Sequence, residues 1–480
     1  MVRTSSYRLT GEFVAEACRG RLVQGAAIAA DGGVSIDSRT LQPGQAFFAI
    51  RGPRHDGHEF LSEAVKAGAS GLVVAASRVR DAQAVAGANA DRVFVVAVEN
   101  PQAALKDLAA AWVDVMAPTV VAVTGSVGKT TTKDLIAAVM RRRYETHATA
   151  GNLNNEYGVP LTCLGLKPKH EVLVVEMGTS APGEIARLCK VARPKVAVVT
   201  AVAPAHLEGF GDIEGVARAK AEIVEALDAD GTAVLNADDP RVLAMKGRTA
   251  ARWVGFGRAA DAGVRVVEVA LEPDGRTRVE FEVQGRRLRS AMNLVGTHQA
   301  MNAAAALAVA TVLPVDLGEA CDAIAQVEPA PHRMALRIAG PIRCLDDCYN
   351  ASPRAMSAAL ETLAALPGAR KVAILGDMLE LGDFAETAHR DLGAEAAARG
   401  VGCLIAVGRH ASVVAQAATA SGMSASSVFV APDAMAAEDL AMALLKPDDT
   451  VLVKASHGVG LERLADRIVA AFRGAENAGN

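Results

Sequence analysis

The stretch VVAVTGSVGKTTTKDLIAAVM, residues 120–140, joins an apolar β-branched segment to a helical pattern through a glycine-containing turn. The standard phosphate-binding loop is Gly-x-x-x-x-Gly-Lys-Ser/Thr; its first glycine would fall on Val123, so that pattern is not met. The order strand, glycine turn, Lys-Thr and helix is still the one that wraps backbone N–H groups around a phosphate. We therefore expect Lys129 to reach the outer phosphates of a nucleotide and Thr130 to ligate Mg²⁺. The alternative is an ordinary strand-to-helix turn with an exposed lysine.

The composition limits the partners and the number of domains. A chain of 480 residues predicts two to four domains, and 51% hydrophobic residues are enough to fill their cores. Because 50 Lys and Arg balance 54 Asp and Glu to give a net charge of −4, nothing favours nucleic acid or an anionic membrane as the main partner. Phosphate binding must therefore be local.

The seven cysteines predict neither a disulfide framework nor a zinc site, because they are scattered, odd in number and without Cys-x-x-Cys spacing. A reducing cytoplasm is the simple inference. The first twenty residues lack the apolar core of a signal peptide, and no uncharged apolar run reaches the 18 residues of a membrane span. The longest candidate, residues 303–315, is too short and predicts a buried helix.

Three α/β domains are expected along the chain. Residues 1–100 mix short strands and helices, and residues 100–118 predict a connecting helix that ends at Pro118. In the range 101–330, apolar strands alternate with helices, as in VVAVTG, EVLVVEMG, KVAVVTAV and TAVLNADD, which is typical of a parallel sheet covered on both faces. A proline-rich run near 328–332 marks a second boundary. Beyond it, 331–480 predicts another doubly wound domain.

Residues 264–296 differ from the rest of the central range. Their polar and apolar residues alternate with period two, and Asp274-Gly275 is a turn signal. We expect an antiparallel hairpin attached to the parallel sheet.

Three further residues could serve a phosphate loop with Mg²⁺. Glu176 directly follows a predicted strand, where a carboxylate can ligate the metal directly or through water, or can be a solvated charge. His206 lies in the loop after the next strand and Lys220 on the following helix; taken alone, either is more often structural or solvated. However, Val216, Ile223, Val224 and Leu227 form an apolar stripe, and Lys220 belongs at its edge.

Nine motifs occur in an order and at separations that resemble the Mur ligase family, over nearly the whole chain. They are TGSVGKTTTK, GNLNNEYGVP, EMGTSAPGEI, VAPAHLEGFG, AKAEI, NADDP, GTHQAMNAAAA, PHRM and LDDCYNASP, between residues 124 and 353. The resemblance is greatest to the members that add D-Ala-D-Ala to UDP-MurNAc-tripeptide in peptidoglycan synthesis. It implies an N-terminal uridine-nucleotide domain, a central P-loop ATPase domain and a C-terminal Rossmann-like domain.

The resemblance also implies roles for particular residues. Glu176 and His206 serve two magnesium sites, and Lys220 matches a lysine that the family carbamylates with CO₂. A carbamate would be a useful metal ligand, because an ammonium repels Mg²⁺ whereas a carbamate resembles a carboxylate. The implied catalytic residues are Lys129, Lys220, His206 and Arg333. The implied ATP-binding residues are Thr124, Gly125, Ser126, Val127, Gly128, Lys129, Thr130, Thr131, Asn302 at the adenine, Arg333 at the γ-phosphate and Asp347 at the ribose, with Asp346 as the alternative to Asp347.

Two segments are implied to bind the nucleotide-sugar substrate. Residues 36–69 resemble the uridine-nucleotide domain, with Ser38 and Arg39 as contacts for the UDP end. The Asn-rich segment 151–158 offers side-chain amides that both donate and accept, although such segments also form turns. These amides belong to Asn152, Asn154 and Asn155.

The chain departs from the family pattern at two places. Gln299 follows His298 where many relatives have asparagine, so Gln299 has no assigned role. Lys454 matches the family, but His457 stands where an arginine is common, which puts the substrate-positioning role of that arginine in doubt.

The reaction implied is ATP-driven amide formation. The terminal carboxylate of the tripeptide attacks the γ-phosphate, and the amine of D-Ala-D-Ala then attacks the acyl phosphate. We expect a cytoplasmic monomer whose site is complete only when the C-terminal domain closes. The rivals are the ligases that add meso-diaminopimelate or lysine, and a non-catalytic nucleotide-binding module. The Asp-Asn-Pro-Arg motif usual in the diaminopimelate enzyme is absent, and the sequence leaves open whether the tripeptide carries diaminopimelate or lysine.

Overall fold

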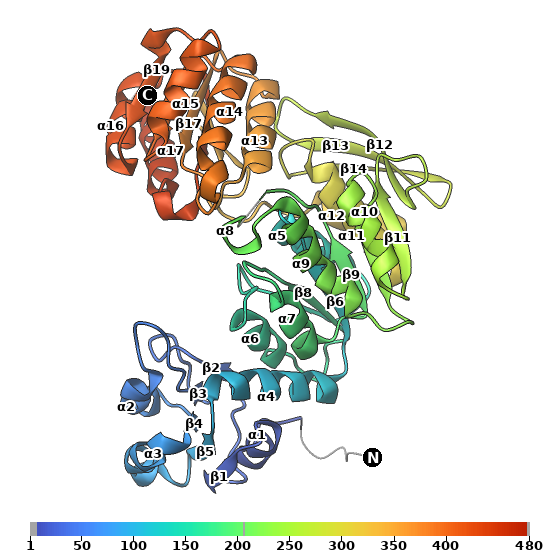
Figure 1. Ribbon diagram of the computed structural model, residues 1–480, viewed down its shortest axis with the longest axis vertical. Coiled ribbons are helices and arrows are strands. Elements are labelled where there is room, and N and C mark those ends of the chain that lie inside the picture. The colour runs from blue at the N-terminus through green and yellow to red at the C-terminus, as the bar shows by residue number, and fades with distance from the viewer. Residues whose placement is uncertain (1–6, 205–206, 478–480) are drawn as a thin grey trace.

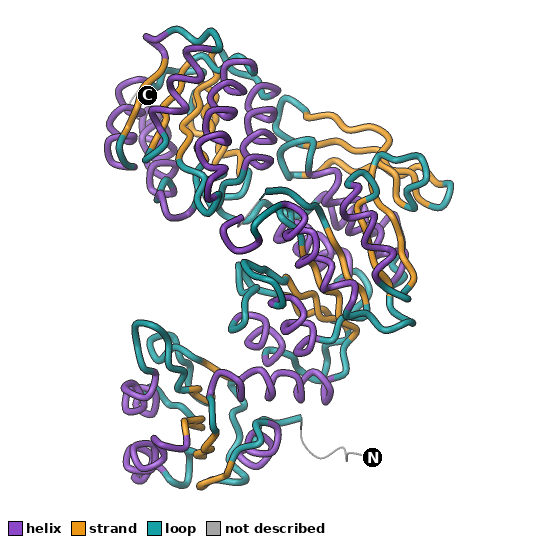
Figure 2. Tube along the Cα trace, in the orientation of Figure 1, coloured by secondary structure: helices purple, strands orange, loops and turns teal. Residues whose placement is uncertain are grey.

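The computed structural model describes residues 7–204 and 207–477. Within these residues the chain forms three β-sheets with helices packed around them, arranged one after another along the long axis of the molecule (Figure 1). Figure 2, which is coloured by secondary structure, shows helices flanking the strands of each sheet. The mixed α/β class predicted from the sequence is confirmed.

The N-terminal sheet has the strand order β1-β5-β4-β3-β2. Strand β1 is antiparallel to β5, and the other pairs are parallel. The segments that form it are β1 (Arg21–Gln24), β2 (Val34–Ser35), β3 (Ala46–Phe48), β4 (Gly71–Ala75) and β5 (Phe94–Val98), with α1 (Gly11–Ala17), α2 (Leu61–Lys66) and α3 (Val79–Ala86).

Helix α4 (Pro101–Met116) is the predicted connecting helix, and it crosses between the N-terminal and central parts (Figure 1). The side chain of Asn100 caps its first turn by accepting hydrogen bonds from two backbone N–H groups, and Pro101 stands at the first position, where no N–H is needed. The helix ends at Met116, and the next residue, Ala117, has a left-handed φ of 47° directly before Pro118.

The central sheet has the order β14-β13-β12-β11-β10-β9-β6-β8-β7, parallel from β7 through β12. Its strands are β6 (Thr119–Thr124), β7 (Thr146–Ala148), β8 (Val172–Glu176), β9 (Val196–Val199), β10 (Thr232–Asn236), β11 (Arg252–Gly257), β12 (Val264–Leu271), β13 (Thr277–Val283) and β14 (Arg286–Met292). Its helices are α5 (Lys129–Met140), α6 (Gly158–Leu164), α7 (Glu184–Ala192), α8 (Leu207–Phe210), α9 (Ile213–Glu225), α10 (Pro240–Ala244), α11 (Gln299–Val312) and α12 (Leu317–Ala325).

Strand β6 lies between β8 and β9, so the chain leaves β6 toward one side of the sheet and later returns on the other side. Ligands in open parallel sheets bind at such a reversal, outside the carboxyl ends of the strands. The stretch 120–140 includes the carboxyl end of β6 and the loop that follows it. The fold therefore puts the predicted phosphate loop at the favoured ligand position.

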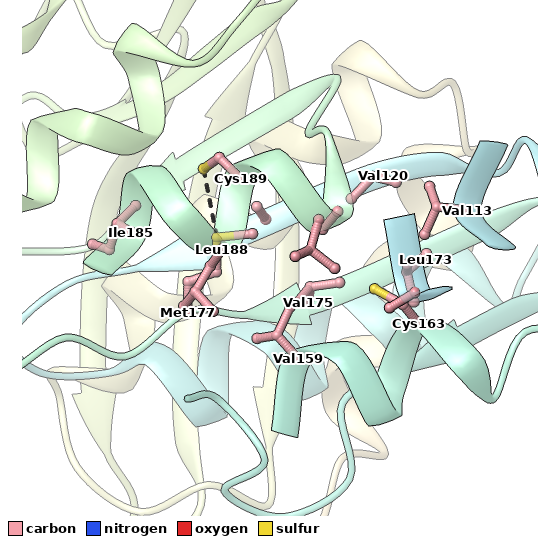
Figure 3. Close-up of a cluster of buried hydrophobic side chains, with 14 of the residues drawn as sticks. Val113, Val120, Val159, Cys163, Leu173, Val175, Met177, Ile185, Leu188 and Cys189 are labelled. Carbon is pink, nitrogen blue, oxygen red and sulfur yellow. Dashed lines mark hydrogen bonds between the residues drawn. The ribbon is translucent and has the colours of Figure 1, made fainter. Parts of the chain in front are cut away.

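Both faces of the parallel strands are buried, which explains their nearly continuous Val and Leu runs. On one face, side chains of β6 and β8 pack against α4, α6 and α7, with Met177 and Cys189 in sulfur contact at 3.7 Å (Figure 3). On the other face, α5 and α11 cover alternate side chains of the same strands. Helix α11 contains residues 303–312 of the predicted buried helix 303–315, and the last three residues lie beyond its end at Val312.

The predicted antiparallel hairpin is a longer meander of β12, β13 and β14. Asp274-Gly275 forms the first turn, as expected, with Gly275 at φ 91°. The prediction missed the second turn, where Gln284 and Gly285 both have positive φ, at 52° and 74°. Gln-Gly is a weaker turn signal than Asp-Gly, because glutamine tolerates left-handed backbone less well.

The C-terminal sheet has the order β15-β16-β20-β17-β18-β19, with β15 antiparallel and the rest parallel. It comprises β15 (Ala335–Ala339), β16 (Ile342–Asp346), β17 (Arg370–Gly376), β18 (Cys403–Val407), β19 (Val428–Ala431) and β20 (Asp449–Lys454). Around it lie α13 (Pro353–Ala365), α14 (Ala385–Ala398), α15 (Ala411–Ala420), α16 (Ala434–Leu444) and α17 (Glu462–Asn477).

The three sheets lie within the ranges 1–100, 101–330 and 331–480, and the domain limits themselves stay predictions. All seven cysteines are buried and free. Among the helices in the described ranges, none combines the length and the apolar character that crossing a bilayer requires.

Candidate active site

A cavity of about 750 Å³ lies between the central and C-terminal parts of the chain. On the central side it is lined by residues at the ends of β6, β8 and β10 and by helix α9. On the C-terminal side it is lined by the two residues that precede β15 and by the segments that follow β16, β17 and β20. Side-chain contacts join the two walls: Thr297 donates a hydrogen bond to Glu361 over 3.0 Å, and Arg354 lies 3.8 Å from Asp239. The cavity therefore depends on both parts being held together.

The loop after β6 needs its two glycines. Gly125 has φ 151° and Gly128 has φ 79°, both in the region that favours glycine. A Cβ on Gly125 would lie 1.9 Å from Thr200 Oγ1, and one on Gly128 would lie 2.4 Å from Asn302 Oδ1. The predicted P-loop is thus a tight turn that leaves no room for side chains on its inner side.

Lys129 begins α5, and its ammonium donates a hydrogen bond to the carbonyl of Gly125 over 2.8 Å. Withdrawal from water lowers the pKa of Lys129; the nearby Glu176 opposes that shift, and the Arg333 guanidinium adds to it. Thr130 follows in the first turn and lines the same cavity. This group of charges at a helix N-terminus is suited to a polyanion.

Glu176, at the end of β8, is 1% exposed. One carboxylate oxygen accepts a hydrogen bond from Asn154 Nδ2 at 2.7 Å, whereas the other, Oε2, has no partner among the described residues. A buried carboxylate oxygen without a partner is costly unless a cation or a donor completes it. The residues present therefore fit a divalent cation at this point.

Lys220 lies on α9 and is 3% exposed, so it is more deeply buried than its expected place at the edge of the apolar stripe. The expectation that it avoids the solvated face is confirmed. Burial and the charge of Lys129 hold the pKa of Lys220 well below its ordinary value. Lys220 lines the cavity, and both causes shift its equilibrium toward the neutral amine.

Asn302, on α11, lines the cavity beneath the phosphate loop. Its Oδ1 accepts a hydrogen bond from the Thr132 hydroxyl at 3.2 Å, and its Nδ2 donates to Gln299 Oε1 at 2.8 Å. Gln299, which had no assigned role, is thus the residue that orients the Asn302 amide. Neither Thr132 nor Gln299 was predicted to contact Asn302. For Thr132 the reason is that a partner 170 residues away in the chain leaves no local signal, whereas Gln299 lies only three residues before Asn302 on the same helix.

Asp347 and Asp346 have different environments. Asp347 lines the cavity; its carboxylate accepts hydrogen bonds from the Lys454 ammonium at 2.6 Å and from the Met334 N–H at 3.0 Å. Asp346 is turned to a separate cluster, where it accepts hydrogen bonds from His332 and Arg337. Of the two acids, the geometry favours Asp347 as the ribose-side residue. Arg333 lines the same wall of the cavity.

The Asn-rich segment also faces the cavity, with Asn152, Asn154 and Asn155 all in its lining. The side-chain N–H of Asn154 is already hydrogen-bonded to Glu176. Asn155 Oδ1 accepts hydrogen bonds from the backbone N–H groups of Tyr157 and Gly158, which is the turn-forming role. The amide oxygen of Asn155 is therefore already used within the loop.

Two of the predicted residues lie away from the cavity, and a third, His206, falls outside the described residues. Ser38 is half-buried and Arg39 is exposed, both on a turn of the N-terminal part that does not line the cavity. Arg39 is paired with Asp37 at 2.6 Å. A separate subsite for the UDP end would place them apart from the phosphate loop, and that role stays a prediction.

Three family models match the chain in order. They are described as "Mur ligase family, catalytic domain" over residues 32–113, "Mur ligase middle domain" over 123–310, and "Mur ligase, glutamate ligase domain" over 332–457. The central and C-terminal matches include both walls of the cavity.

Curated relatives and solved structures are similar over most of the chain. The UDP-N-acetylmuramoyl-tripeptide--D-alanyl-D-alanine ligase of Mycobacterium tuberculosis (strain ATCC 25618 / H37Rv) is 36% identical, with 92% of each chain covered. The enzyme of that name from Escherichia coli (strain K12) is 36% identical, covering 84% of this chain and 86% of its own.

Among solved structures, MurF from Acinetobacter baumannii matches with a TM-score of 0.85 at 27% identity, covering 96% of this chain and 99% of its own. MurF from Thermotoga maritima in complex with ADP matches with a TM-score of 0.77 at 30% identity, covering 92% and 97%. The motifs, the fold and these matches agree, and the chain belongs to the Mur ligase family.

Proposed function

We propose that the protein is an ATP-dependent amide ligase that adds D-Ala-D-Ala to UDP-MurNAc-tripeptide, in the synthesis of peptidoglycan precursor. The observation that carries the proposal is the shared cavity, which brings Lys129 and Glu176 of the central part to the same space as Arg333 and Asp347 of the C-terminal part. The identities of the two substrates are inferred from the names of the relatives.

The phosphates of ATP would lie on the loop 124–131. Backbone N–H groups at the start of α5 and the Lys129 ammonium offer positive charge to the β- and γ-phosphates, and Arg333 offers it from the opposite wall. Asn302 and Asp347 are assigned to the adenine and the ribose. Because phosphoryl transfer needs mainly positioning and charge neutralisation, these residues suffice without a protein nucleophile.

Thr130 and Glu176 are the residues that would hold Mg²⁺ among those described, and the unpartnered Oε2 of Glu176 supports this assignment. Bound there, the ion would neutralise charge on the phosphates of ATP. Asn154 orients Glu176 through the other oxygen. His206 is proposed as a further metal ligand from the sequence alone.

Lys220 is proposed to be carbamylated. Its amine nitrogen would attack the carbon of CO₂, a C–N bond would form, and one proton would leave to water. The product is a carbamate that carries a negative charge in place of an ammonium, so it would serve a second metal site. Deep burial and the lowered pKa support the neutral amine that this step requires.

The chemistry has two steps. The terminal carboxylate of the tripeptide attacks the γ-phosphorus and expels ADP, giving an acyl phosphate. The amine of D-Ala-D-Ala attacks the acyl carbon, loses a proton, and the tetrahedral intermediate expels phosphate. Asn152, beside the cavity on the central wall, is proposed to contact the peptide substrate, and Ser38 and Arg39 its UDP end.

Both walls of the cavity come from one chain, so a monomer is expected, and a cytoplasmic location fits the ATP and nucleotide-sugar substrates. The testing experiment follows phosphate release from ATP by the purified protein. The proposal requires release that depends on UDP-MurNAc-tripeptide and D-Ala-D-Ala together. Release that needs neither, or equal release when a single amino acid replaces the dipeptide, would contradict it.

A further inference from the structure

Arg333 is flanked by two residues with unusual backbone conformations. His332 has φ 59° and Met334 has φ 51°, so both are left-handed although both carry a Cβ. Such conformations persist only where surrounding contacts hold them, and they concentrate at functional sites. The backbone on either side of Arg333 is therefore held in place by other parts of the structure.

The segment after β16 supplies those contacts. The backbone N–H of Tyr349 donates a hydrogen bond to the His332 carbonyl over 3.0 Å. The Asp347 carboxylate accepts a hydrogen bond from the backbone N–H of Met334 at 3.0 Å, and the Asp346 carboxylate accepts one from the imidazole Nδ1 of His332 at 2.9 Å. Residues 346–349 thus clamp the main chain on both sides of Arg333.

The side chain of Arg333 is also fixed. Its guanidinium carbon lies 3.7 Å from the centroid of the Tyr349 ring, a close cation–π contact. The ring of Tyr349 also stacks on His457, with 6.0 Å between the ring centroids and an interplanar angle of 29°. The Glu462 carboxylate accepts a hydrogen bond from His457 Nδ1 at 2.6 Å. His457 is the residue that replaces the common arginine, and here it packs on Tyr349.

We propose that Tyr349 is a positioning residue for the ligase reaction, which holds the guanidinium of Arg333 in the orientation that meets the γ-phosphate. A free arginine side chain must lose rotamer freedom when it binds a phosphate, and a stacked one has already lost it. Tyr349 therefore acts through Arg333 and not by touching the reacting atoms. The inference rests on the proposed function.

The first test separates the aromatic ring from its hydroxyl. Tyr349→Phe keeps the ring face and is expected to retain kcat within about twofold, whereas Tyr349→Leu loses it and is expected to lower kcat about tenfold. Thermal melting of both variants checks that they fold. Wild-type kcat in folded Tyr349→Leu, or an equal loss in Tyr349→Phe, would overturn the proposal.

The second test asks whether Tyr349 acts through Arg333. In the Arg333→Lys background, Tyr349→Leu should cost less than about threefold, because the ammonium lacks the planar group that the ring orients. Losses that multiply as if the two residues were independent would overturn the proposal. So would a rise in the KM for ATP with kcat unchanged, since that result would assign Tyr349 to binding the base.

The proposed function can fail separately. If the wild-type protein releases no phosphate in the presence of both substrates, the ligase proposal fails before any variant is compared. If the wild type is active and the Tyr349 variants behave like it, only the positioning role fails.

Discussion

Asn154 donates a hydrogen bond to Glu176 over 2.7 Å, and the second carboxylate oxygen of Glu176 is buried without a partner in the described part of the chain. If that oxygen ligates Mg²⁺, Glu176→Gln replaces it with a donor or a weaker neutral acceptor of nearly the same shape. We expect kcat/KM to fall at least about tenfold and the Mg²⁺ concentration for half-maximal activity to rise. Activity is measured across a Mg²⁺ titration.

The matched control for that titration is Glu225→Gln, on the surface and paired with Arg248. It should leave the Mg²⁺ dependence as in the wild type. An unchanged Mg²⁺ dependence in Glu176→Gln would remove Glu176 from the metal site.

Gly128→Ala should weaken nucleotide binding. The new Cβ would lie 2.4 Å from Asn302 Oδ1, and the residue would have to keep φ 79°, which costs a non-glycine residue about 1 kcal/mol or more. We expect at least about a tenfold loss of ATP affinity by calorimetry. Gly247→Ala, where the Cβ meets nothing within 4 Å, is the control. Equal ATP affinity in both variants would count against nucleotide binding at this loop.

Lys220→Ala should be nearly inactive, because it removes the proposed carbamate ligand. Acetate or formate at high concentration should partly restore its activity by filling the same space with a carboxylate, while leaving Lys129→Ala inactive. Phosphate release with and without the added acid is the measurement. A Lys220→Ala variant that keeps most of its activity without added acid would rule out the carbamate.

His389 is hydrogen-bonded to the residue that precedes a loop of the cavity. Its Nε2 accepts a hydrogen bond from the Met378 N–H at 3.0 Å, and residues 379–381 line the cavity. Burial lowers the pKa of His389 below 6.5; the stacked His410 lowers it further, and Ala385 O and Asp377 oppose the shift. The unfolded chain therefore takes up the proton first as the pH falls, so this contribution to stability is present above about pH 6.5 and is lost below it.

His389→Gln keeps an acceptor for the Met378 N–H but does not titrate. The melting-temperature advantage of the wild type over this variant should shrink as the pH is lowered from about 7.5 to about 5, in a series of thermal scans. A melting-temperature difference that stays constant over that pH range would show that protonation of His389 does not contribute to the pH dependence of stability.

Much of the site could be predicted from local sequence. The stretch 120–140 carries a strand, two glycines and a helix start within one continuous segment, so its position at the end of β6 followed from pattern alone. The stripe on α9 likewise indicated that Lys220 lies at its edge and not on the fully solvated face. The acidic end of β8 placed Glu176 beside the loop, because parallel neighbours end at the same edge.

What could not be predicted depends on residues far apart in the sequence. Thr132 matters because its hydroxyl donates a hydrogen bond to Asn302, which lies 170 residues further along the chain on another helix. The different environments of Asp346 and Asp347 follow from the alternation of side chains at the end of β16, and the sequence left these adjacent acids open. Packing between elements decides such contacts, and it leaves little trace in any one segment.

The acyl-phosphate step can be followed through oxygen atoms. UDP-MurNAc-tripeptide labelled with ¹⁸O in its terminal carboxylate is incubated with ATP, Mg²⁺, D-Ala-D-Ala and the protein, and the phosphate and the peptide product are analysed by mass spectrometry. Attack of the carboxylate on the γ-phosphorus predicts one ¹⁸O in each phosphate released and one in the new amide. Ligated product accompanied by unlabelled phosphate would contradict activation of the carboxylate by ATP, and labelled tripeptide recovered without any ligated product would contradict the ligase itself.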